Sequence, residues 1–386
     1  MKNKIYAVGI TAFVLIWFAL AGFSWFGPKQ DVSLSERRKL EQAPELSIQT
    51  ILAKDVKDDD GNIVERNSFM SKFELFTLDQ FPLRDQFRQV KSIFQFYVMQ
   101  QKDNNDIYIT GDYAAELLYP MDTLQVEVNS SVMQKIYDKY LKGRANTYVA
   151  IVPDKGYYLA QQNGYLSLDY QELFDKIEDG VKDVDQEGKN KIQYIDLTDS
   201  LDAGSYYYTD THWRQEKIVP VAQKLAEAMG TTVQPESAYT KELVENPFYG
   251  VYYGFAALPM DPEQMYLMHS DVLDGCIIKN PETGAVIPLY DMAKAESNDL
   301  YDIFFSGNQP LIQIENPKAT GNKELVVFSD SFGRSLAPLL TQGYRKITVV
   351  DLRLTSYLNL DHKLFLRRPD VLFLYSTISL NGAIAR

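Results

Sequence analysis

The sequence predicts a mixed α/β fold with a mainly parallel sheet, preceded by a transmembrane helix and a helical segment. An uncharged apolar run lies near the N-terminus, and aromatic residues then recur at helical spacing. From residue 107 onward, short apolar runs rich in β-formers alternate with helical stretches. Strands that alternate with helices are typical of a parallel sheet that has helices on both faces.

The N-terminal apolar run covers residues 5–26 and follows Lys2 and Lys4. About 20 apolar residues are enough for a helix to cross a bilayer. Lysines on the short side predict a cytoplasmic N-terminus, so we interpret residues 1–30 as a single-pass anchor in the cell membrane, with an extracytoplasmic remainder. The alternative is a cleaved signal peptide, because residues 19–21 have the spacing of a cleavage site. We favour the anchor, since the apolar run continues beyond them.

Composition limits the partners and cofactors. The formal net charge of −13 argues against nucleic acid or anionic lipid as the main partner. The single cysteine, Cys276, excludes an intramolecular disulfide, and its apolar neighbours predict a buried strand residue. The sequence contains no CxxC, HExxH or clustered histidine pattern, so no metal and no other cofactor is predicted.

Residues 31–105 are predicted to form a mostly helical connecting segment. Aromatic and aliphatic side chains repeat at helical spacing between Phe69 and Gln101, and Pro82 is predicted to separate two helices. Membrane contact is one explanation for such a stripe. Packing into a core is the commoner one, and we predict it here.

Residues 106–386 are predicted to form the α/β domain. A helix is predicted from Trp213 to Met229, with Pro220 bending it or lying near its start, and a helix-like segment is predicted from Arg334 to Gly343. Residues 241–322 fit the alternation less well, and we interpret them as an insertion near the active-site face. The predicted strands are Thr147–Val152, Ile192–Leu197, Glu324–Phe328, Ile347–Asp351 and Val371–Tyr375.

Ser331 is the candidate nucleophile. A predicted strand ends at Phe328 and a helix is predicted to begin near Gly333, which places Ser331 at the edge of the sheet where α/β proteins hold their sites. Backbone N–H groups at a helix start can stabilise an oxyanion. The alternative is that Ser329, Asp330 or Ser331 only caps the helix.

His212 is the candidate general base. Asp210 precedes it by two residues, and in an extended segment both side chains would project to the same side. Asp210 would then orient the imidazole, the role of the third member of a catalytic triad. Trp213 would pack under the histidine or line an acyl pocket, with ordinary core packing as the alternative. The other histidines, His269 and His362, are interpreted as surface or structural residues.

The motif Asp-Thr-His-Trp at 210–213, followed by Ser-Asp-Ser-Phe at 329–332, resembles the DHHW family and the alginate O-acetylation proteins, which belong to the SGNH-hydrolase-like group. The likeness extends from about residue 33 to the end of the chain. It implies an SGNH-hydrolase-like three-layer fold with Ser331 as nucleophile, His212 as base and Asp210 as orienting residue. Three further blocks carry it: Ser35–Leu40, Gln80–Arg84 and Val152–Lys155.

Two positions depart from the family pattern. Thr211 stands where the DHHW motif has histidine, although threonine suits the alginate-type relatives, and Ser329 replaces the usual glycine before Asp-Ser. The asparagine that completes the oxyanion hole of ordinary SGNH enzymes has no clear counterpart. Asn381 is the candidate, and with Trp213 it forms the predicted substrate-binding set.

The resemblance implies a membrane-anchored serine acyl-transfer enzyme, either an O-acetyltransferase or an O-acetylesterase. It would act on a cell-surface polysaccharide through an acyl-serine intermediate, beside a membrane-bound O-acyltransferase as partner. One alternative is a catalytically inactive glycan-binding or assembly protein of a polysaccharide-modification complex, which Ser329 favours. Another is a membrane-tethered scaffold in which Asp210 and His212 are a buried polar pair.

Overall fold

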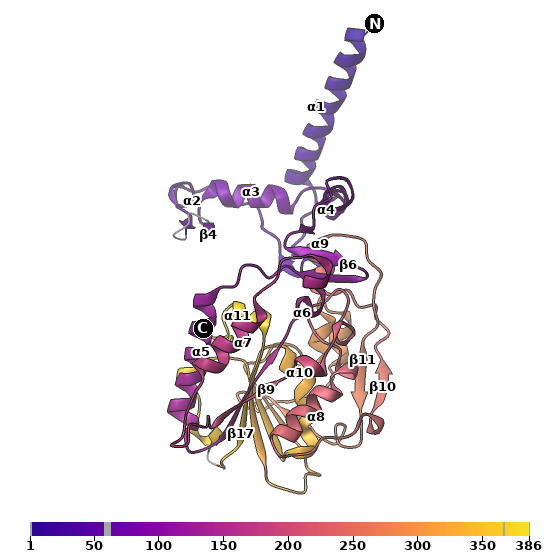
Figure 1. The fold of residues 1–386 in the computed structure, drawn as a ribbon. Helices are drawn as coiled ribbons and strands as arrows, with labels where there is room; N and C mark the ends of the chain where they lie inside the picture. Colours follow the sequence, from indigo (N-terminus) through magenta and orange to yellow (C-terminus); the bar gives the residue numbers. More distant parts are fainter. Residues whose placement is uncertain (1, 58–62, 366, 386) are drawn as a thin grey trace. The chain divides into compact units, whose positions relative to one another are not determined.

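The computed structural model describes residues 2–57, 63–365 and 367–385, and the chain divides into two compact units (Figure 1). Unit 1 contains residues 1–101 together with 257–259. Unit 2 contains residues 102–256 together with 260–386. The two units are described in turn.

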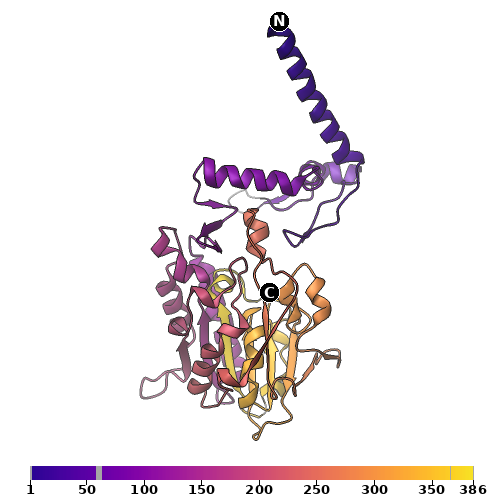
Figure 2. The same cartoon turned by 90° about the vertical axis from the view of Figure 1, so that its right-hand side faces the viewer.

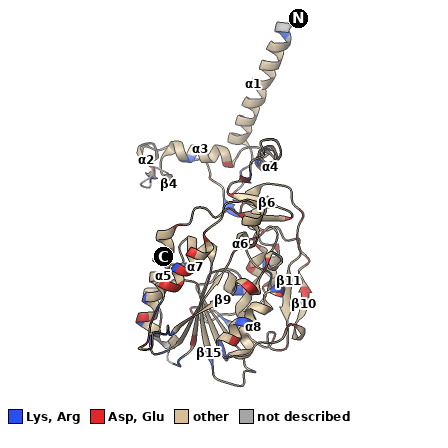
Figure 3. Ribbon diagram, viewed as in Figure 1, with Lys and Arg blue, Asp and Glu red and all other residues tan. Residues whose placement is uncertain are grey.

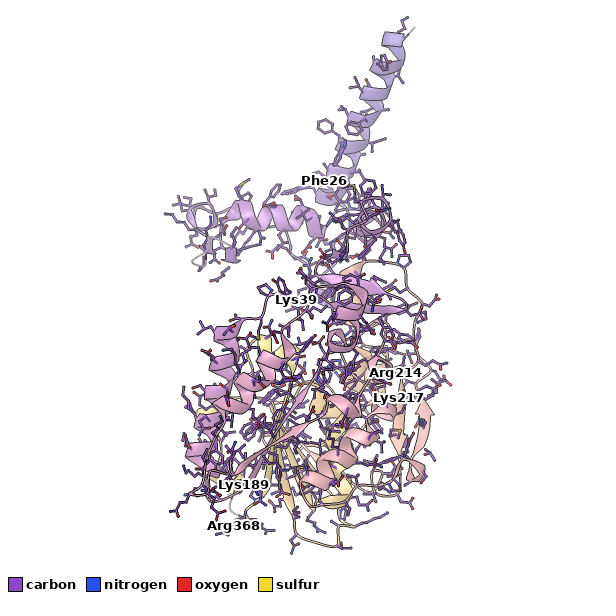
Figure 4. The ribbon with its side chains drawn as sticks, viewed as in Figure 1. Phe26, Lys39, Lys189, Arg214, Lys217 and Arg368 are labelled. Atoms are coloured by element: carbon purple, nitrogen blue, oxygen red, sulfur yellow. The ribbon has the colours of Figure 1, made fainter. Side chains whose placement is uncertain are left out.

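Unit 1 begins with helix α1 (Lys2–Phe26). Within it, Tyr6–Phe26 is long and apolar enough to cross a membrane, with a mean hydropathy of 2.1. A signal sequence near the N-terminus can have the same length and apolar composition. Figure 3 shows α1 in tan along almost its whole length, since its lysines lie in the first turn, and Figure 4 labels Phe26 at its far end.

The rest of unit 1 is mostly helical, as predicted. Pro82 lies between α3 and α4, as predicted, but the predicted core packing is wrong for most of α4. Phe76 is buried, whereas Phe87 and Val90 are 50% and 64% exposed. The elements are β1 (Val32–Ser33), β2 (Arg38–Lys39), α2 (Ile48–Leu52), β3 (Val56–Lys57), β4 (Ile63–Glu65), α3 (Phe69–Asp79), α4 (Arg84–Ile93) and a π-helical turn (Phe94–Val98).

Unit 2 is built on an eight-stranded sheet of order β13-β12-β14-β16-β15-β17-β8-β9. The five strands from β16 to β9 are parallel to one another, and they correspond to the five predicted strands. The mainly parallel α/β fold is therefore confirmed. The strands are β8 (Asn146–Val152), β9 (Ile192–Asp196), β12 (Ile277–Lys279), β13 (Val286–Ile287), β14 (Leu311–Glu315), β15 (Glu324–Ser329), β16 (Lys346–Val350) and β17 (Asp370–Ser376).

Helices cover both faces of this sheet, which gives three layers (Figures 1 and 2). Neighbouring side chains of a strand project to opposite faces, so Val327 and Phe328 of β15 belong to different cores. α5 (Thr123–Ile136), α7 (Tyr170–Gly180) and α11 (Thr377–Asn381) pack on the Phe328 face. α8 (Val219–Ala228) and α10 (Phe332–Leu336) pack on the Val327 face.

The predicted insertion adds the antiparallel edge strands β14, β12 and β13 to the sheet. It also holds α9, and its strand β11 pairs with β10 outside the sheet. A separate three-stranded sheet, β5-β6-β7, precedes α5. The remaining elements are β5 (Asp103–Asn104), β6 (Ile107–Thr110), β7 (Tyr113–Glu116), α6 (Lys155–Leu159), β10 (Thr240–Leu243), α9 (Val251–Ala256) and β11 (Tyr266–His269).

One predicted helix and one predicted strand residue need correction. The helix predicted from Trp213 begins only at Val219, with Pro220 near its start, because proline fits the first turn of a helix and not its interior. The segment from Arg334 to Gly343 is helical as predicted, with a 3₁₀ helix (Ala337–Gly343) after α10. Cys276 is partly exposed and precedes β12, where its thiol contacts the carbonyl of Val272.

Candidate active site

Ser331 lies in the turn between β15 and α10, as predicted. It is the N-cap residue of α10, yet its side chain makes no capping hydrogen bond. Asp330 has that role, because its Oδ1 accepts from the N–H of Phe332 at 3.1 Å. Its Oδ2 accepts from the N–H of Ser376 on the neighbouring strand at 2.9 Å. The capping alternative is therefore correct for Asp330 and wrong for Ser331, whose hydroxyl is left for other contacts.

Ser329 fits the turn without backbone strain. It is the last residue of β15 and has ordinary strand geometry, so the glycine of the family pattern is not needed for a positive φ. Its side chain instead occupies the space beside Gly333. A Cβ at position 333 would lie 2.1 Å from Ser329 Oγ. The serine at 329 is thus accommodated by the absence of a side chain at 333.

Residues 205–214 form a tight reversing loop, so the prediction of an extended segment is wrong. The N–H of Tyr207 donates to the carbonyl of His212 at 3.1 Å, and the N–H of Arg214 donates to that of Ser205 at 2.8 Å. Asp210 lies at the tip of this loop. Its Oδ1 accepts from the backbone N–H of His212 at 3.0 Å, so the two side chains meet through the turn itself.

The structure brings the three predicted residues together. His212 Nδ1 lies 2.6 Å from Asp210 Oδ1, and His212 Nε2 lies 2.7 Å from Ser331 Oγ. Asp210 is fully buried, His212 is 6% exposed, and Ser331 is only partly buried. A carboxylate only accepts hydrogen bonds, so the proton belongs on Nδ1 and the lone pair of Nε2 faces the serine hydroxyl. This is the tautomer that a general base needs.

Aromatic contacts fix the imidazole ring. The ring of Tyr301 stacks on His212 with centroids 3.8 Å apart and an interplanar angle of 8°, and Phe332 lies 5.1 Å away. Ser335 Oγ accepts from Tyr301 at 2.7 Å and from the indole N–H of Trp213 at 2.8 Å. Trp213 is fully buried and offers no surface to a ligand. Core packing, the alternative for this residue, is what the structure shows.

Glu263 accepts hydrogen bonds from the loop of residues 205–214. Its carboxylate accepts from the N–H groups of Tyr208 and Thr209 at 2.7 and 2.8 Å. It also accepts from Arg214, labelled in Figure 4, at 2.8 Å. A buried carboxylate with several donors to it is a well-satisfied acceptor. Glu263 therefore stabilises the strand-like arm that leads into the tip of the loop.

Gly250 and Val251 hold the tip of the same loop. The N–H of Val251 donates to Asp210 Oδ2 at 2.9 Å, and the N–H of Gly250 donates to Thr209 Oγ1 at 2.8 Å. A Cβ at Gly250 would lie 2.2 Å from the backbone of Thr209 and Asp210. Only glycine permits this approach. Residues of the predicted insertion therefore contact the loop that carries Asp210 and His212.

Lys155 donates hydrogen bonds to backbone carbonyls of the same loop. It is almost completely buried, and its Nζ donates to the carbonyls of Tyr207 and Tyr208 at 2.8 and 2.9 Å. Burial lowers the pKa of the Lys155 amine to about 7. A neutral amine still has two N–H groups, which is the number that these two carbonyls require.

Several solved protein structures are similar to this chain. A DHHW family protein from Eubacterium siraeum DSM 15702 is 20% identical, with a TM-score of 0.58 over 72% of this chain and 93% of that one. The chain has the fold of a DHHW family protein. Bacillus cereus PatB1 with sulfonyl adduct is 17% identical, with a TM-score of 0.56 over 72% of this chain and 96% of PatB1. A second structure of Bacillus cereus PatB1 is also 17% identical, with a TM-score of 0.54 over 72% of this chain and 98% of PatB1.

No protein-family model and no curated protein matches the sequence. At these identities the likeness to the DHHW protein is one of fold, and the resemblance drawn from the motifs is confirmed at that level. The SGNH-hydrolase-like fold is confirmed with it. Thr211, where the DHHW motif has histidine, is a partly exposed residue at the tip of the loop.

The remaining candidate residues have partners other than Asp210, His212 and Ser331. The side-chain oxygen of Asn381 accepts from the N–H of Asp122 at 2.7 Å, so this residue ties α11 to the start of α5. His269 is partly exposed between Glu242 and Asp274. The side chain of His362 lies outside the described residues. In the described part of the chain, no group of three or more His, Cys, Asp and Glu residues has the arrangement of a metal site.

Sequence reasoning missed Lys155 as a support, and it missed Gly250, Glu263 and Tyr301 altogether. Val152–Lys155 entered only as part of the resemblance. The other three lie in the insertion, where no periodicity or motif marks them. Their roles depend on which residues the fold places beside the loop.

Proposed function

We propose that this chain is a membrane-anchored, extracytoplasmic acyl-transfer enzyme that moves or removes O-acetyl groups on a cell-surface polysaccharide. The observation that carries the proposal is the hydrogen-bonded series Asp210–His212–Ser331, with heavy-atom distances of 2.6 and 2.7 Å. A serine hydroxyl is a weak nucleophile unless a base takes its proton, and this geometry supplies the base.

In the proposed reaction, Ser331 Oγ bonds to the carbonyl carbon of an acetyl ester while its proton moves to His212 Nε2. The buried carboxylate of Asp210 stabilises the imidazolium that forms. The tetrahedral intermediate then expels the donor's alkoxide, which takes the proton from Nε2 and leaves acetyl-Ser331. A sugar hydroxyl (transfer) or water (hydrolysis) repeats the sequence in reverse and frees the serine.

The intermediate carries an oxyanion that needs hydrogen-bond donors. The first turn of α10 was expected to provide them, but the N–H of Phe332 and that of Gly333 already donate to Asp330. The N–H of Ser331 takes part in no hydrogen bond within the described residues. We assign it as the backbone donor to the oxyanion.

Two features support the activated serine and the location. The similar structure of PatB1 holds a sulfonyl adduct, and sulfonyl compounds modify activated hydroxyl groups such as the one proposed here. The apolar span Tyr6–Phe26 supports attachment to the membrane, which would keep the enzyme near a membrane-bound O-acyltransferase that supplies acetyl groups. The inactive glycan-binding alternative loses its support, because Ser329 leaves the turn intact.

The test uses the full chain in detergent, with a chromogenic acetyl ester and acetylated glycans as donors. Ser331→Ala and His212→Ala should each lower the rate by at least about 10³-fold, because the members of a triad act as a unit. His269→Ala is the matched histidine control. A sulfonyl fluoride should label the wild type at Ser331 and leave His212→Ala unlabelled.

Acetate release that is equal in all four proteins would contradict the proposal. So would the absence of activity and labelling in the folded wild type, with acceptor glycans present. Transfer is distinguished from hydrolysis by the product: an acetylated acceptor glycan or free acetate.

A further inference from the structure

An exposed apolar stripe runs along α4 and the π-helical turn that continues it. The residues follow one another at intervals of four, three, four and three positions, which places them on one face of a helix. Their exposed fractions lie between 50% and 73%. The stripe, called the α4 stripe below, consists of Leu83, Phe87, Val90, Phe94 and Tyr97.

The opposite face of α4 is the one packed inside unit 1. Arg84 and Arg88 both pair with Glu36, and Arg84 also approaches Asp79 at 3.6 Å. Ser92 on this face is fully buried. A surface helix of a soluble domain normally turns its apolar face inward and its charges outward. In α4 the charged side chains face unit 1 instead, so the apolar face is directed away from unit 1.

The start of α4 lies beside the end of α1. The Trp25 ring in the last turn of α1 contacts Phe73 and Phe76 of α3, with centroids 5.8 and 5.6 Å apart. Phe23 of α1 and Leu83 of the stripe line one common pocket. The stripe therefore begins at the point where α1 would leave a bilayer.

The helices next to α1 also have the direction that a membrane surface requires. α3 runs crosswise to α1 in Figure 1, and α4 runs crosswise to it in the turned view of Figure 2. Helices that lie across a membrane-spanning helix are parallel to the bilayer plane. Phe and Tyr side chains, which the stripe contains, are common in helices buried at the headgroup boundary.

We propose that the α4 stripe inserts into the headgroup–acyl boundary of the outer leaflet of the membrane that α1 crosses. The occupant of this apolar face is a lipid surface. The inference rests on the proposed membrane anchoring and is independent of the catalytic proposal. It gives unit 1 two attachments to the bilayer, α1 through it and α4 along it.

The test uses the full chain with Cys276→Ser, reconstituted into phosphatidylcholine–phosphatidylglycerol nanodiscs. Single cysteines carry an environment-sensitive fluorophore at Phe87→Cys on the stripe, at Asp85→Cys on the opposite face, and at Trp17→Cys within α1. Lipids with a spin label near the headgroup should quench the Phe87 label several-fold more than the Asp85 label. Aqueous iodide should give the reverse order. Tyr97→Cys is a second stripe position in case Phe87→Cys does not fold.

The reference label separates the two ways in which the test can fail. If the label at position 17 is open to aqueous iodide, the membrane anchoring fails, and the inference fails with it. If that label is protected from iodide while both stripe labels remain as open to iodide as position 85, the anchoring stands and lipid contact is excluded. The stripe would then be a face for a protein partner, which contradicts the inference.

Discussion

The two segments that meet at the candidate site are held in place in different ways. Residues 324–336 form a strand, a turn and a helix, and Ser331 is positioned by the regular structure on either side of it. Residues 205–214 form a loop with no regular element of more than three residues. Its shape depends on hydrogen bonds donated by Lys155, Gly250 and Val251 and on those that Glu263 accepts.

This difference shows where each segment tolerates change. In the strand–turn–helix segment the tight contact at Gly333 is with a side chain, that of Ser329. In the loop the tight contact at Gly250 is with the backbone of Thr209 and Asp210. A side chain can be removed by a second substitution, whereas a backbone cannot. The loop should therefore be the more fragile half of the site.

Among the substitutions that compare the supports of the two segments, the largest effect is expected from Gly250→Ala. The new methyl group would lie 2.2 Å from the backbone of Thr209 and Asp210, so the loop that carries Asp210 and His212 must move. We expect a loss of about 1–3 kcal/mol in the free energy of unfolding, since overpacking has this cost. Acetyl release should fall about 10²-fold, the effect of a 1 Å misplacement. Chemical denaturation and the ester assay measure both.

Gly321→Ala is the matched control, because no atom lies within 4 Å of a Cβ added there. It should leave stability and rate unchanged. A Gly250→Ala protein with wild-type stability and rate would show that the loop is not held as described.

The next effect is expected from Gly333→Ala, which brings a methyl group to 2.1 Å from Ser329 Oγ. Alone it should also cost about 1–3 kcal/mol. Adding Ser329→Gly removes the clashing atoms and should restore stability to within about 1 kcal/mol, the cost of glycine in a strand. Equilibrium unfolding of both single variants and the double variant completes the cycle. If the double variant is no more stable than Gly333→Ala, the clash is not with Ser329.

Lys155 gives a smaller, pH-dependent test of the loop. Burial lowers its pKa from 10.5 to about 7, so between these values the unfolded chain binds a proton that the folded chain does not. The cost of burying the charge is fully present below pH 7 and disappears as pH rises toward 10.5. Relative to Lys155→Met, the wild type should gain up to about 1.4 kcal/mol of unfolding free energy per pH unit in this window.

Denaturation of both proteins at several pH values checks this slope. Lys189→Met, at an exposed position labelled in Figure 4, is the control and should differ from the wild type by a constant amount. A constant difference for Lys155→Met as well would mean that Lys155 stays charged in the folded protein.

The smallest effect is expected from His269→Ala. This histidine is partly exposed and lies 2.8 Å from Glu242 and 2.9 Å from Asp274, and such surface contacts contribute little. Stability should change by less than about 0.5 kcal/mol and acetyl release should be unchanged. A large loss of activity would challenge the choice of His212 as base.

The sequence by itself determined the main architecture. Four of the five parallel strands are visible as apolar, β-rich runs because they are buried on both faces of the sheet, whereas the edge strand β9 keeps Gln193 and Asp196 exposed. Ser331 follows from the same pattern, since a turn after a buried strand has a defined place at the edge of the sheet. The apolar span of α1 follows from length and composition. These features depend on neighbours in the chain, which a sequence shows directly.

Only the tertiary structure decided how His212 is held and which apolar residues are covered. The loop at 205–214 is stabilised by hydrogen bonds to side chains and amides of the insertion, up to 55 residues away along the chain. The aromatic repeat in α4 has the spacing of a core helix, yet the ion pairs of Arg84 and Arg88 turn its apolar face outward. Periodicity reveals that a helix has two faces. Which of them is buried depends on contacts between residues that are distant in the sequence.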